Sequence, residues 1–233
     1  LFHDRSDAQG VVALADVRVG GNLYLLSLSN AEEALRVWRI SDAGMITAVS
    51  QVGAGAGLGI AAPTDLQVVQ AFGRSYAVVA AAGSSSISIV ALDDDGQMQL
   101  ADHVIDTRET RFQSVQAVAT AQVAAQVFLF AGGADGGVQA FRMLPDGRLI
   151  TAGQVITSAE VGLQRIVAIE AIVIDGRIEL VIGREGAGIV RLRFDPGDLA
   201  PAAMGGNGDD AITGDARDDL LWGGAGDDTL SGG

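Results

Sequence analysis

Aspartates and glycines recur at a fixed spacing in the last 29 residues of the chain, from Gly205 onward. Three nine-residue units, GGNGDDAIT, GDARDDLLW and GGAGDDTLS, follow one another without a gap, and a fourth begins at Gly232. The sixth residue of each unit is an aspartate, and these are Asp210, Asp219 and Asp228. Glycines allow tight turns whose backbone carbonyls point inward. Carboxylate and carbonyl oxygens together suit a hard cation such as Ca²⁺, which takes about 6–8 oxygen ligands.

The eighth residue of each unit is aliphatic, which predicts a short strand after every turn; these residues are Ile212, Leu221 and Leu230. The units resemble the G-G-x-G-x-D-x-U-x repeat of RTX (haemolysin-type) calcium-binding proteins, which fold as a parallel β-roll. The resemblance implies that Ca²⁺ lies between the turns of repeats n and n+2, so that 205–210 would face 223–228. The metal-binding residues it implies are Gly205, Gly206, Gly208, Asp210, Asp219, Gly223, Gly224, Gly226 and Asp228.

The middle unit departs from the repeat, because Asp215 and Arg217 stand where the family has glycine. An arginine at a position that expects positive φ predicts backbone strain, and its charge opposes a nearby cation. The alternative is an acidic, glycine-rich linker that stays disordered, but such a linker would not place an aliphatic residue at every ninth position. Because this tail holds seven aspartates and one arginine, we expect it to order with calcium and to be disordered without it.

The composition excludes several classes of function. The net charge is −14, which argues against a nucleic-acid partner, because no basic patch could neutralise phosphates. All 15 basic residues are arginine, so Schiff-base lysine chemistry is excluded. The absence of cysteine excludes disulfides and thiolate ligands, and it suits the type I export that the RTX resemblance implies. No apolar run approaches the ~20 residues of a membrane helix. The start, Leu1–Asp4, is unlike a signal peptide, and we expect the sequence to begin inside a longer polypeptide.

The chain before the tail has a longer repeat. Turn glycines recur at intervals of 52, 51 and 50 residues, at Gly44, Gly96, Gly147 and Gly197. Each repeat unit contains short runs rich in Val, Ile and Phe that are bounded by Gly, Asp and Pro; in the third unit they are 114–121, 126–132, 137–144 and 148–155. Such runs predict four strands for each unit of about 50 residues. The second run is nearly all apolar, as expected of a strand sandwiched between neighbouring sheets.

These features predict an all-β chain: a β-propeller of four-stranded blades followed by a short β-roll. The repeat resembles lactonase-like and WD40/YVTN-type propellers over residues 8–200. The expected domains are 1–200 for the propeller, with blades at about 8–52, 53–106, 107–157 and 158–200, then a linker at 201–204 and the roll at 205–233. No clear fourth strand precedes Pro201. A β-sandwich or β-solenoid is the alternative.

Four visible blades suggest part of a larger ring, completed by upstream blades or by a partner chain. An incomplete ring would expose an apolar blade face. The sequence favours the upstream continuation.

The sequence favours a non-enzymatic protein. The lactonase-like resemblance implies a hydrolase with charged groups around a central channel, and the weak catalytic candidates are Glu170 and Glu179, which interrupt apolar strands. Asp102 and His103 could form half of a triad, but no G-x-S-x-G elbow supplies a nucleophile. His3 lies far from His103 in the sequence, so a zinc site is not expected.

The preferred hypothesis is a secreted bacterial calcium-binding protein, located outside the cell or on its surface. Its tail would fold when it meets calcium after type I export, and its propeller would bind another protein chain or a cell-surface component. The alternatives are a secreted lactonase-like hydrolase that uses the tail only for export, and a structural subunit of a surface layer or particle.

Overall fold

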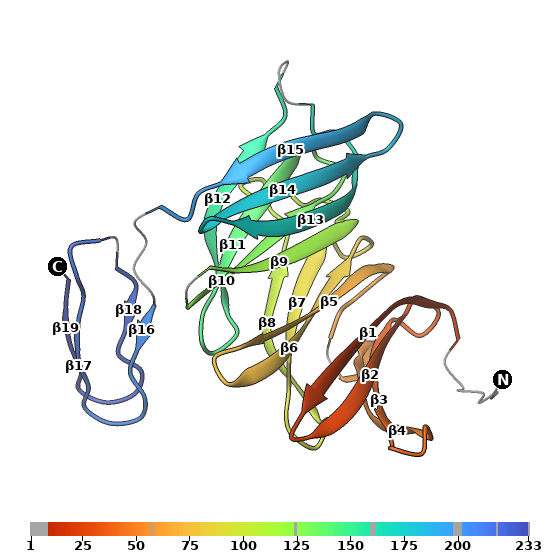
Figure 1. The fold of residues 1–233 in the computed structure, drawn as a ribbon, viewed down its shortest axis with the longest axis horizontal. Coiled ribbons are helices and arrows are strands. Elements are labelled where there is room, and N and C mark those ends of the chain that lie inside the picture. The colour runs from red at the N-terminus through yellow and green to blue at the C-terminus, as the bar shows by residue number, and fades with distance from the viewer. Residues whose placement is uncertain are drawn as a thin grey trace.

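The computed structural model describes residues 9–56, 58–123, 125–158, 162–197, 202–217 and 219–232. Those residues form strands β1 to β19 and a single 3₁₀ turn, η1 (Ala54–Ala56). Figure 1 shows sheets that follow one another from the first strands to β15, with a separate pair of short ladders at the C-terminal end. The fold class is therefore all-β, as predicted.

The strands form blade-like sheets in chain order. The first sheet contains β1 (Val11–Val19), β2 (Asn22–Ser29), β3 (Ala34–Ile40) and β4 (Ile46–Gly53). The second contains β5 (Pro63–Ala71), β6 (Arg74–Ala81), β7 (Ser86–Leu92) and β8 (Met98–Ile105). The third contains β9 (Ala117–Val123), β10 (Gln126–Gly132), β11 (Gly137–Met143) and β12 (Leu149–Ile156). The fourth has three strands in the described residues: β13 (Ile166–Ile174), β14 (Arg177–Arg184) and β15 (Gly188–Phe194).

The repeat is also present in the strand register. All neighbours within these four sheets are antiparallel, and the third and fourth strands of the first three sheets shift register at one equivalent point. The shifts lie at Val37/Trp38, Ile89/Val90 and Ala140/Phe141. A bulge increases the local twist of a strand pair. The shared bulge therefore gives the sheets the same twist, which lets them stack face to face.

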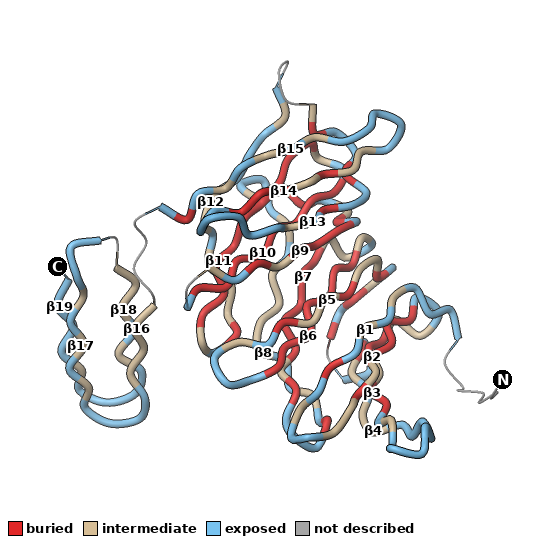
Figure 2. The backbone as a smooth tube through the Cα atoms, viewed as in Figure 1, coloured by how far each residue is buried: buried red, intermediate tan, exposed pale blue. Residues whose placement is uncertain are grey.

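Three apolar cores lie between successive sheets, and Figure 2 shows the buried segments concentrated on the middle strands. Every residue of β10 and β11 is buried, whereas no residue of β12 is. The second strand loses its alternation because it packs against a sheet on each face, as the sequence predicted. Each core joins a sheet to the next one along the chain, and the first strands β1, β5, β9 and β13 contact one another in that order.

One position in the second strand shows how neighbouring sheets are joined. The Tyr24 hydroxyl donates to the Asp94 carbonyl at 2.9 Å, and the Tyr76 hydroxyl donates to the Pro145 carbonyl at 2.9 Å. Each bond ties one sheet to the turn between the last two strands of the next sheet. The equivalent residue of the third sheet is Phe128, whose ring lies 5.2 Å from that of Phe194 in the fourth sheet.

The fourth sheet has Glu179 at this position, paired across β13 and β15 with Ile172 and Arg193. Its far face therefore combines charged residues with exposed aliphatic ones. Ile172 and Ile189 are 45% and 72% exposed. The apolar surface expected at the end of an open array is present, but an ion-pair cluster interrupts it.

The C-terminal ladders differ from the sheets because their strands are parallel and very short. β16 (Ala203–Met204) pairs with β18 (Leu221–Trp222), and β17 (Ala211–Thr213) pairs with β19 (Thr229–Ser231). Each pair joins segments 18 residues apart, which is two repeat units. This is the arrangement of a short parallel β-roll. β16 lies within 201–204, where the sequence analysis placed a linker.

Candidate metal centre

Each turn of the roll is closed by its own aspartate. The Gly206 amide donates to Asp210 Oδ2 at 2.7 Å, and the Asp215 amide donates to Asp219 Oδ1 at 3.2 Å. In the third turn, Asp228 Oδ2 lies where a Cβ on Gly223 would stand. The aspartate at the sixth position therefore folds back over the start of its own unit.

The first residue of each unit must be glycine, because the aspartate carboxylate of that unit lies directly against it. A Cβ at Gly205, Gly214 or Gly223 would collide with the carboxylate of its own unit. Gly224 and Gly226 have φ of 100° and 134°, and a Cβ on either would strike the carbonyl oxygen of a residue in the first turn. Only glycine permits both the backbone conformation and this close approach.

The first and third turns lie directly against each other, in the pairing that the RTX resemblance implied. The Gly208 amide donates to the Ala225 carbonyl at 2.6 Å, and the Ala225 amide donates to the Gly206 carbonyl at 3.0 Å. The carboxylates also cross between the turns, because the Asp210 amide donates to Asp228 Oδ1 at 2.9 Å. One aspartate of the third turn thus contacts both turns.

The residues of this pair of turns fit a calcium ion. The carbonyl oxygens of Gly206, Gly208 and Gly223 reach the opposing turn, close to the positions that a Cβ would fill. Asp210 and Asp228 add carboxylate oxygens. Calcium accepts carbonyl and carboxylate ligands in flexible geometry. Across the described parts of the chain, no group of three or more acidic or histidine side chains gathers around one point. A cation here would therefore rely mainly on the backbone.

The middle turn is organised differently. Arg217 Nε donates to both oxygens of Asp215, at 2.9 and 3.0 Å. The side-chain hydrogen bonds from Arg217, followed by its backbone amide, hold the pKa of Asp215 at about 2. The strain expected at Arg217 does not occur, because Arg217 is not among the non-glycine residues of positive φ in the described segments. The turn has changed its shape, and a guanidinium neutralises the carboxylate that replaced glycine.

The two catalytic candidates lie on the far face of the fourth sheet. Glu179 is 5% exposed and accepts hydrogen bonds at 2.8 Å from Arg191 Nε and Arg193 Nε. These bonds lower its pKa to about 2, so it is a poor proton donor or acceptor near neutral pH. Glu170 is exposed on β13. Two surface grooves lie beside β1 and β5, and neither Glu170 nor Glu179 lines them.

The Asp102–His103 pair is occupied by structural contacts. Asp102 Oδ2 accepts from the Leu149 amide of the third sheet at 2.7 Å, and Oδ1 accepts from the amide of His103. His103 Nδ1 lies 2.8 Å from Ser88 Oγ, but Ser88 is fully buried. The carboxylate therefore does not orient the ring, and the hydroxyl is inaccessible to a substrate. His3 lies outside the described residues.

One contact between the roll and the propeller has no signal in the sequence. The guanidinium of Arg148 lies 4.1 Å from the centre of the Trp222 ring. A polar groove, lined by Arg18, Gln70 and Arg74 among others, was also not predicted. Arg18, Gln70 and Gln122 are spaced by 52 residues, and this spacing could have revealed the groove. In the structure the Gln70 side chain donates to the Arg18 carbonyl, and the Gln122 side chain donates to the Gln70 carbonyl, both at 2.8 Å.

A family model matches part of the chain. Residues 204–233 match the RTX calcium-binding nonapeptide repeat (4 copies). Comparison with curated protein sequences gives no match. The chain contains no helix, among its described residues, with the length and apolar character needed to cross a membrane.

Solved structures also resemble the chain. One is the SapL1 lectin in complex with alpha methyl fucoside, which is 11% identical with a TM-score of 0.53. The match covers 79% of this chain and 61% of the lectin chain. At this identity the likeness concerns the fold alone. It does not distinguish a lactonase-like propeller from a WD40/YVTN-type propeller.

Proposed function

We propose that the roll binds Ca²⁺ between the turns 205–210 and 223–228, with Asp210 and Asp228 as the carboxylate ligands. The observation that carries this proposal is the direct stacking of these turns, in which the Asp210 amide donates to Asp228 Oδ1 at 2.9 Å. The glycines proposed as ligands provide carbonyl oxygens: Gly205, Gly206 and Gly208 in the first turn, and Gly223, Gly224 and Gly226 in the third. The match to the calcium-binding repeat over 204–233 supports the same ion.

Asp219 has a smaller role in this proposal. It closes the middle turn through the Asp215 amide, and Arg217 already neutralises Asp215. The positive charge of Arg217 opposes a second cation on that side of the roll. We therefore expect one calcium ion for the pair of outer turns and none at the middle turn.

The tail folds in response to calcium in this proposal. Bound calcium supplies the positive charge that relieves the repulsion between the aspartates. The chain's own residues then close the turns, pair β16 with β18 and pair β17 with β19. Metal binding and folding are one equilibrium when the site does not exist in the unfolded chain. A tail that orders only in calcium-rich surroundings suits a bacterial protein secreted by a type I channel, which folds outside the cell or on its surface.

The propeller serves as a scaffold that binds another protein chain or a cell-surface component. Its turns are held in place by neighbouring sheets, as Tyr24 and Tyr76 show, so the loops have fixed positions. Rigid scaffolds that present loops are common in binding proteins. The ion pairs of Glu179 argue against its use in hydrolysis.

Self-assembly into a surface layer is a second candidate, and one observation favours it. Leu14 on the first sheet is 60% exposed, and Ile189 on the fourth is 72% exposed. Exposed aliphatic residues on both outer sheets would be covered if copies packed together. Sedimentation with and without calcium tests this candidate, because a structural subunit would form large assemblies at micromolar concentration.

Calorimetric titration with CaCl₂, followed in parallel by far-ultraviolet circular dichroism, tests the calcium site. We expect heat and a gain in β signal at a common midpoint. The variants Asp210→Asn and Asp228→Asn each remove one ligand charge and should raise the midpoint roughly tenfold or more. Asp175→Asn is the matched control, since Asp175 lies in the β13–β14 turn of the fourth sheet. A wild-type chain with neither heat nor spectral change would contradict the proposal.

A further inference from the structure

The two ladders of the roll have different outer faces. Successive side chains of a strand lie on opposite faces, so the ninth residue of each unit lies on the face opposite to the aliphatic eighth residue. On β17 and β19 the ninth residues are Thr213 and Ser231, which are polar. On β18 the ninth residue is Trp222, and on β16 its partner across the parallel pair is Met204, which directly precedes the first unit. One ladder therefore has an apolar outer face and the other a polar face.

The apolar ladder is the one nearer to the propeller. Figure 1 shows β16 and β18 on the propeller side of the roll, with β17 and β19 on the far side. The Arg148 guanidinium lies over the Trp222 ring at 4.1 Å. Its Nη2 atom is buried and has no hydrogen-bond partner in the described residues. A stacked aromatic face offsets part of that desolvation, and arginine stacks on such a face better than lysine does.

Arg148 belongs to the turn between β11 and β12 of the third blade, and the second blade contacts this turn. The turn is closed by the bonds from the Leu144 amide to the Arg148 carbonyl at 2.8 Å and from the Gly147 amide to the Leu144 carbonyl at 2.9 Å. The Tyr76 hydroxyl of the second sheet binds the Pro145 carbonyl of the same turn. Arg148 Nε is held by Asp146 at 2.6 Å. The guanidinium is therefore fixed relative to both the second and the third blade.

We propose that Met204 and Trp222 form a docking face that attaches the calcium-loaded roll to the Arg148 turn of the propeller. The proposal rests on the calcium site proposed above. Met204 and Trp222 become neighbours only when β16 pairs with β18, so docking requires an ordered roll. By linkage, calcium binding then strengthens docking, and docking strengthens calcium binding by the same factor.

Trp222 itself supplies the measurement. The chain has two tryptophans. Trp38 is 7% exposed and its Nε1 donates to Ser27 Oγ at 2.8 Å, whereas Trp222 is 45% exposed. Acrylamide quenching of the full chain therefore reports mainly on Trp222. In the presence of calcium, Arg148→Ala should increase the quenching of Trp222, because the guanidinium no longer covers one face of the ring.

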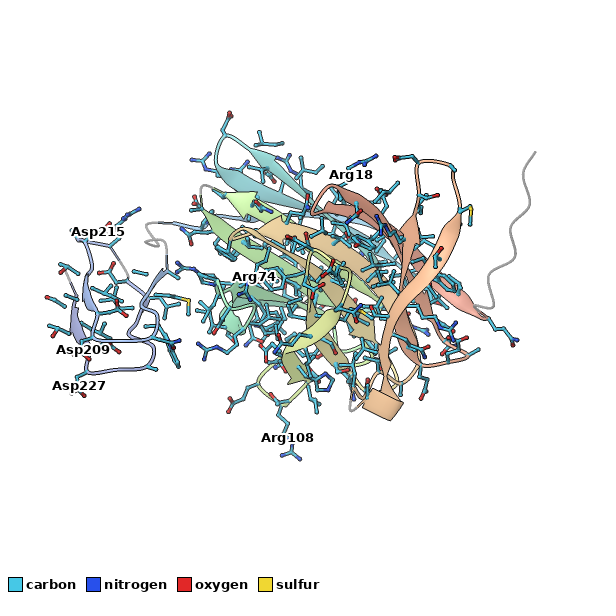
Figure 3. All side chains as sticks on the ribbon, turned by 90° about the horizontal axis from the view of Figure 1, so that it is seen from below. Arg18, Arg74, Arg108, Asp209, Asp215 and Asp227 are labelled. Carbon is cyan, nitrogen blue, oxygen red and sulfur yellow. The ribbon has the colours of Figure 1, made fainter. Side chains whose placement is uncertain are left out.

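The calcium concentration at the midpoint of the circular-dichroism change measures the coupling between docking and calcium binding. Trp222→Thr places at this position the residue that the roll already uses at Thr213, so the ninth-position strand geometry is preserved. Trp222→Thr and Arg148→Ala should each raise the calcium concentration at the circular-dichroism midpoint by roughly two- to fivefold, the range of an exposed cation–π contact. The double variant should show no further increase, because both changes remove the same contact. Arg108→Ala, an arginine that points away from the roll in Figure 3, is the control and should leave the midpoint unchanged.

The outcomes separate the two proposals. A wild-type calcium response that is identical in Trp222→Thr and Arg148→Ala would overturn the docking and leave the calcium site standing. Additive shifts in the double variant would also overturn it, because the two residues would then act independently. A wild-type chain without any calcium response would contradict the calcium site. Acrylamide quenching of Trp222 in the wild type and in Arg148→Ala would then test docking by itself. Equal quenching in the two proteins would overturn the docking proposal.

Discussion

The propeller and the roll both pair their strands through backbone hydrogen bonds, but they bury very different fractions of the paired residues. All seven residues of β10 are buried, whereas all three residues of β19 are exposed. Burying a large apolar side chain contributes about 1.5–3 kcal/mol, so the sheets have ample stabilisation of their own. The roll has two or three residues in each strand and little to bury. The difference indicates that the propeller is stable without a ligand, whereas the roll depends on one.

Removal of calcium should have the largest effect, and it should separate the amide exchange rates of the roll from those of the propeller. With a chelator present, amide protons of β17 and β19 should exchange at nearly the rate of an unfolded peptide. Amides of β6 and β10 should stay protected by at least about a thousandfold, because their opening requires unfolding of the propeller. Hydrogen exchange read by mass spectrometry of peptic fragments measures both regions in one sample. Equal protection of the roll with and without calcium would contradict its dependence on the ion.

A cavity in a blade core should have the next largest effect, and only on the propeller. Phe130 is fully buried, with its ring 5.2 Å from that of Phe194. Phe130→Ala should lower the free energy of unfolding by about 3–5 kcal/mol, because it leaves a void between the third and fourth sheets. Urea unfolding followed by circular dichroism measures this loss. The calcium midpoint should not change, and a large shift would show that the two regions fold as one unit.

A single hydroxyl at the junction of two blades should have a smaller effect. Tyr76→Phe removes the bond to the Pro145 carbonyl and should cost about 0.5–1.5 kcal/mol in urea unfolding. The third sheet already has Phe128 at the equivalent position, so the ring itself is tolerated there. Because Pro145 belongs to the Arg148 turn, this variant should also weaken docking of the roll. Tyr24→Phe, which breaks the equivalent bond to Asp94, is the control and should leave docking unchanged.

Much of the fold could be predicted because it depends on periodic signals. The spacing of Gly44, Gly96 and Gly147 indicates repeated turns, and the apolar second strands indicate sheets stacked on both faces. The turn closed by Gly206 and Asp210 could be predicted because both residues belong to one nine-residue unit that recurs. Each of these signals recurs at a fixed spacing along the chain.

Contacts between distant, non-repeated residues could not be predicted in this way. Arg148 and Trp222 are 74 positions apart and belong to repeats of different lengths, so no period relates them. Arg217 was expected to be strained, but the turn changed shape and paired it with Asp215, a choice that depends on side-chain geometry. Glu179 resembled a catalytic residue because it interrupts an apolar strand, and only the positions of Arg191 and Arg193 reveal its structural role.

The smallest effect should come from the protonation of two carboxylates whose pKa is lowered, one in each region. Hydrogen bonds from Arg191 and Arg193 lower the pKa of Glu179 from 4.5 to about 2, and Arg217 lowers that of Asp215 from 3.8 to about 2. A depressed pKa in the folded state means that the stabilisation is present above the unfolded pKa and is lost as the pH falls toward 2. The propeller should therefore lose the contribution of Glu179 between about pH 4.5 and 2.

Glu179→Gln should flatten this part of the pH profile of propeller unfolding, whereas Glu170→Gln, on the neighbouring strand β13, should leave it unchanged. Urea unfolding at pH 7 and at pH 3 measures the difference. In the roll, Asp215→Asn should remove the pairing with Arg217 without any effect on the propeller profile, because Asp215 lies outside the propeller sheets and their three cores. If Asp215→Asn changed the acid profile of the propeller as much as Glu179→Gln does, the two regions would share their electrostatic stabilisation, and the contrast drawn from their burial would not hold.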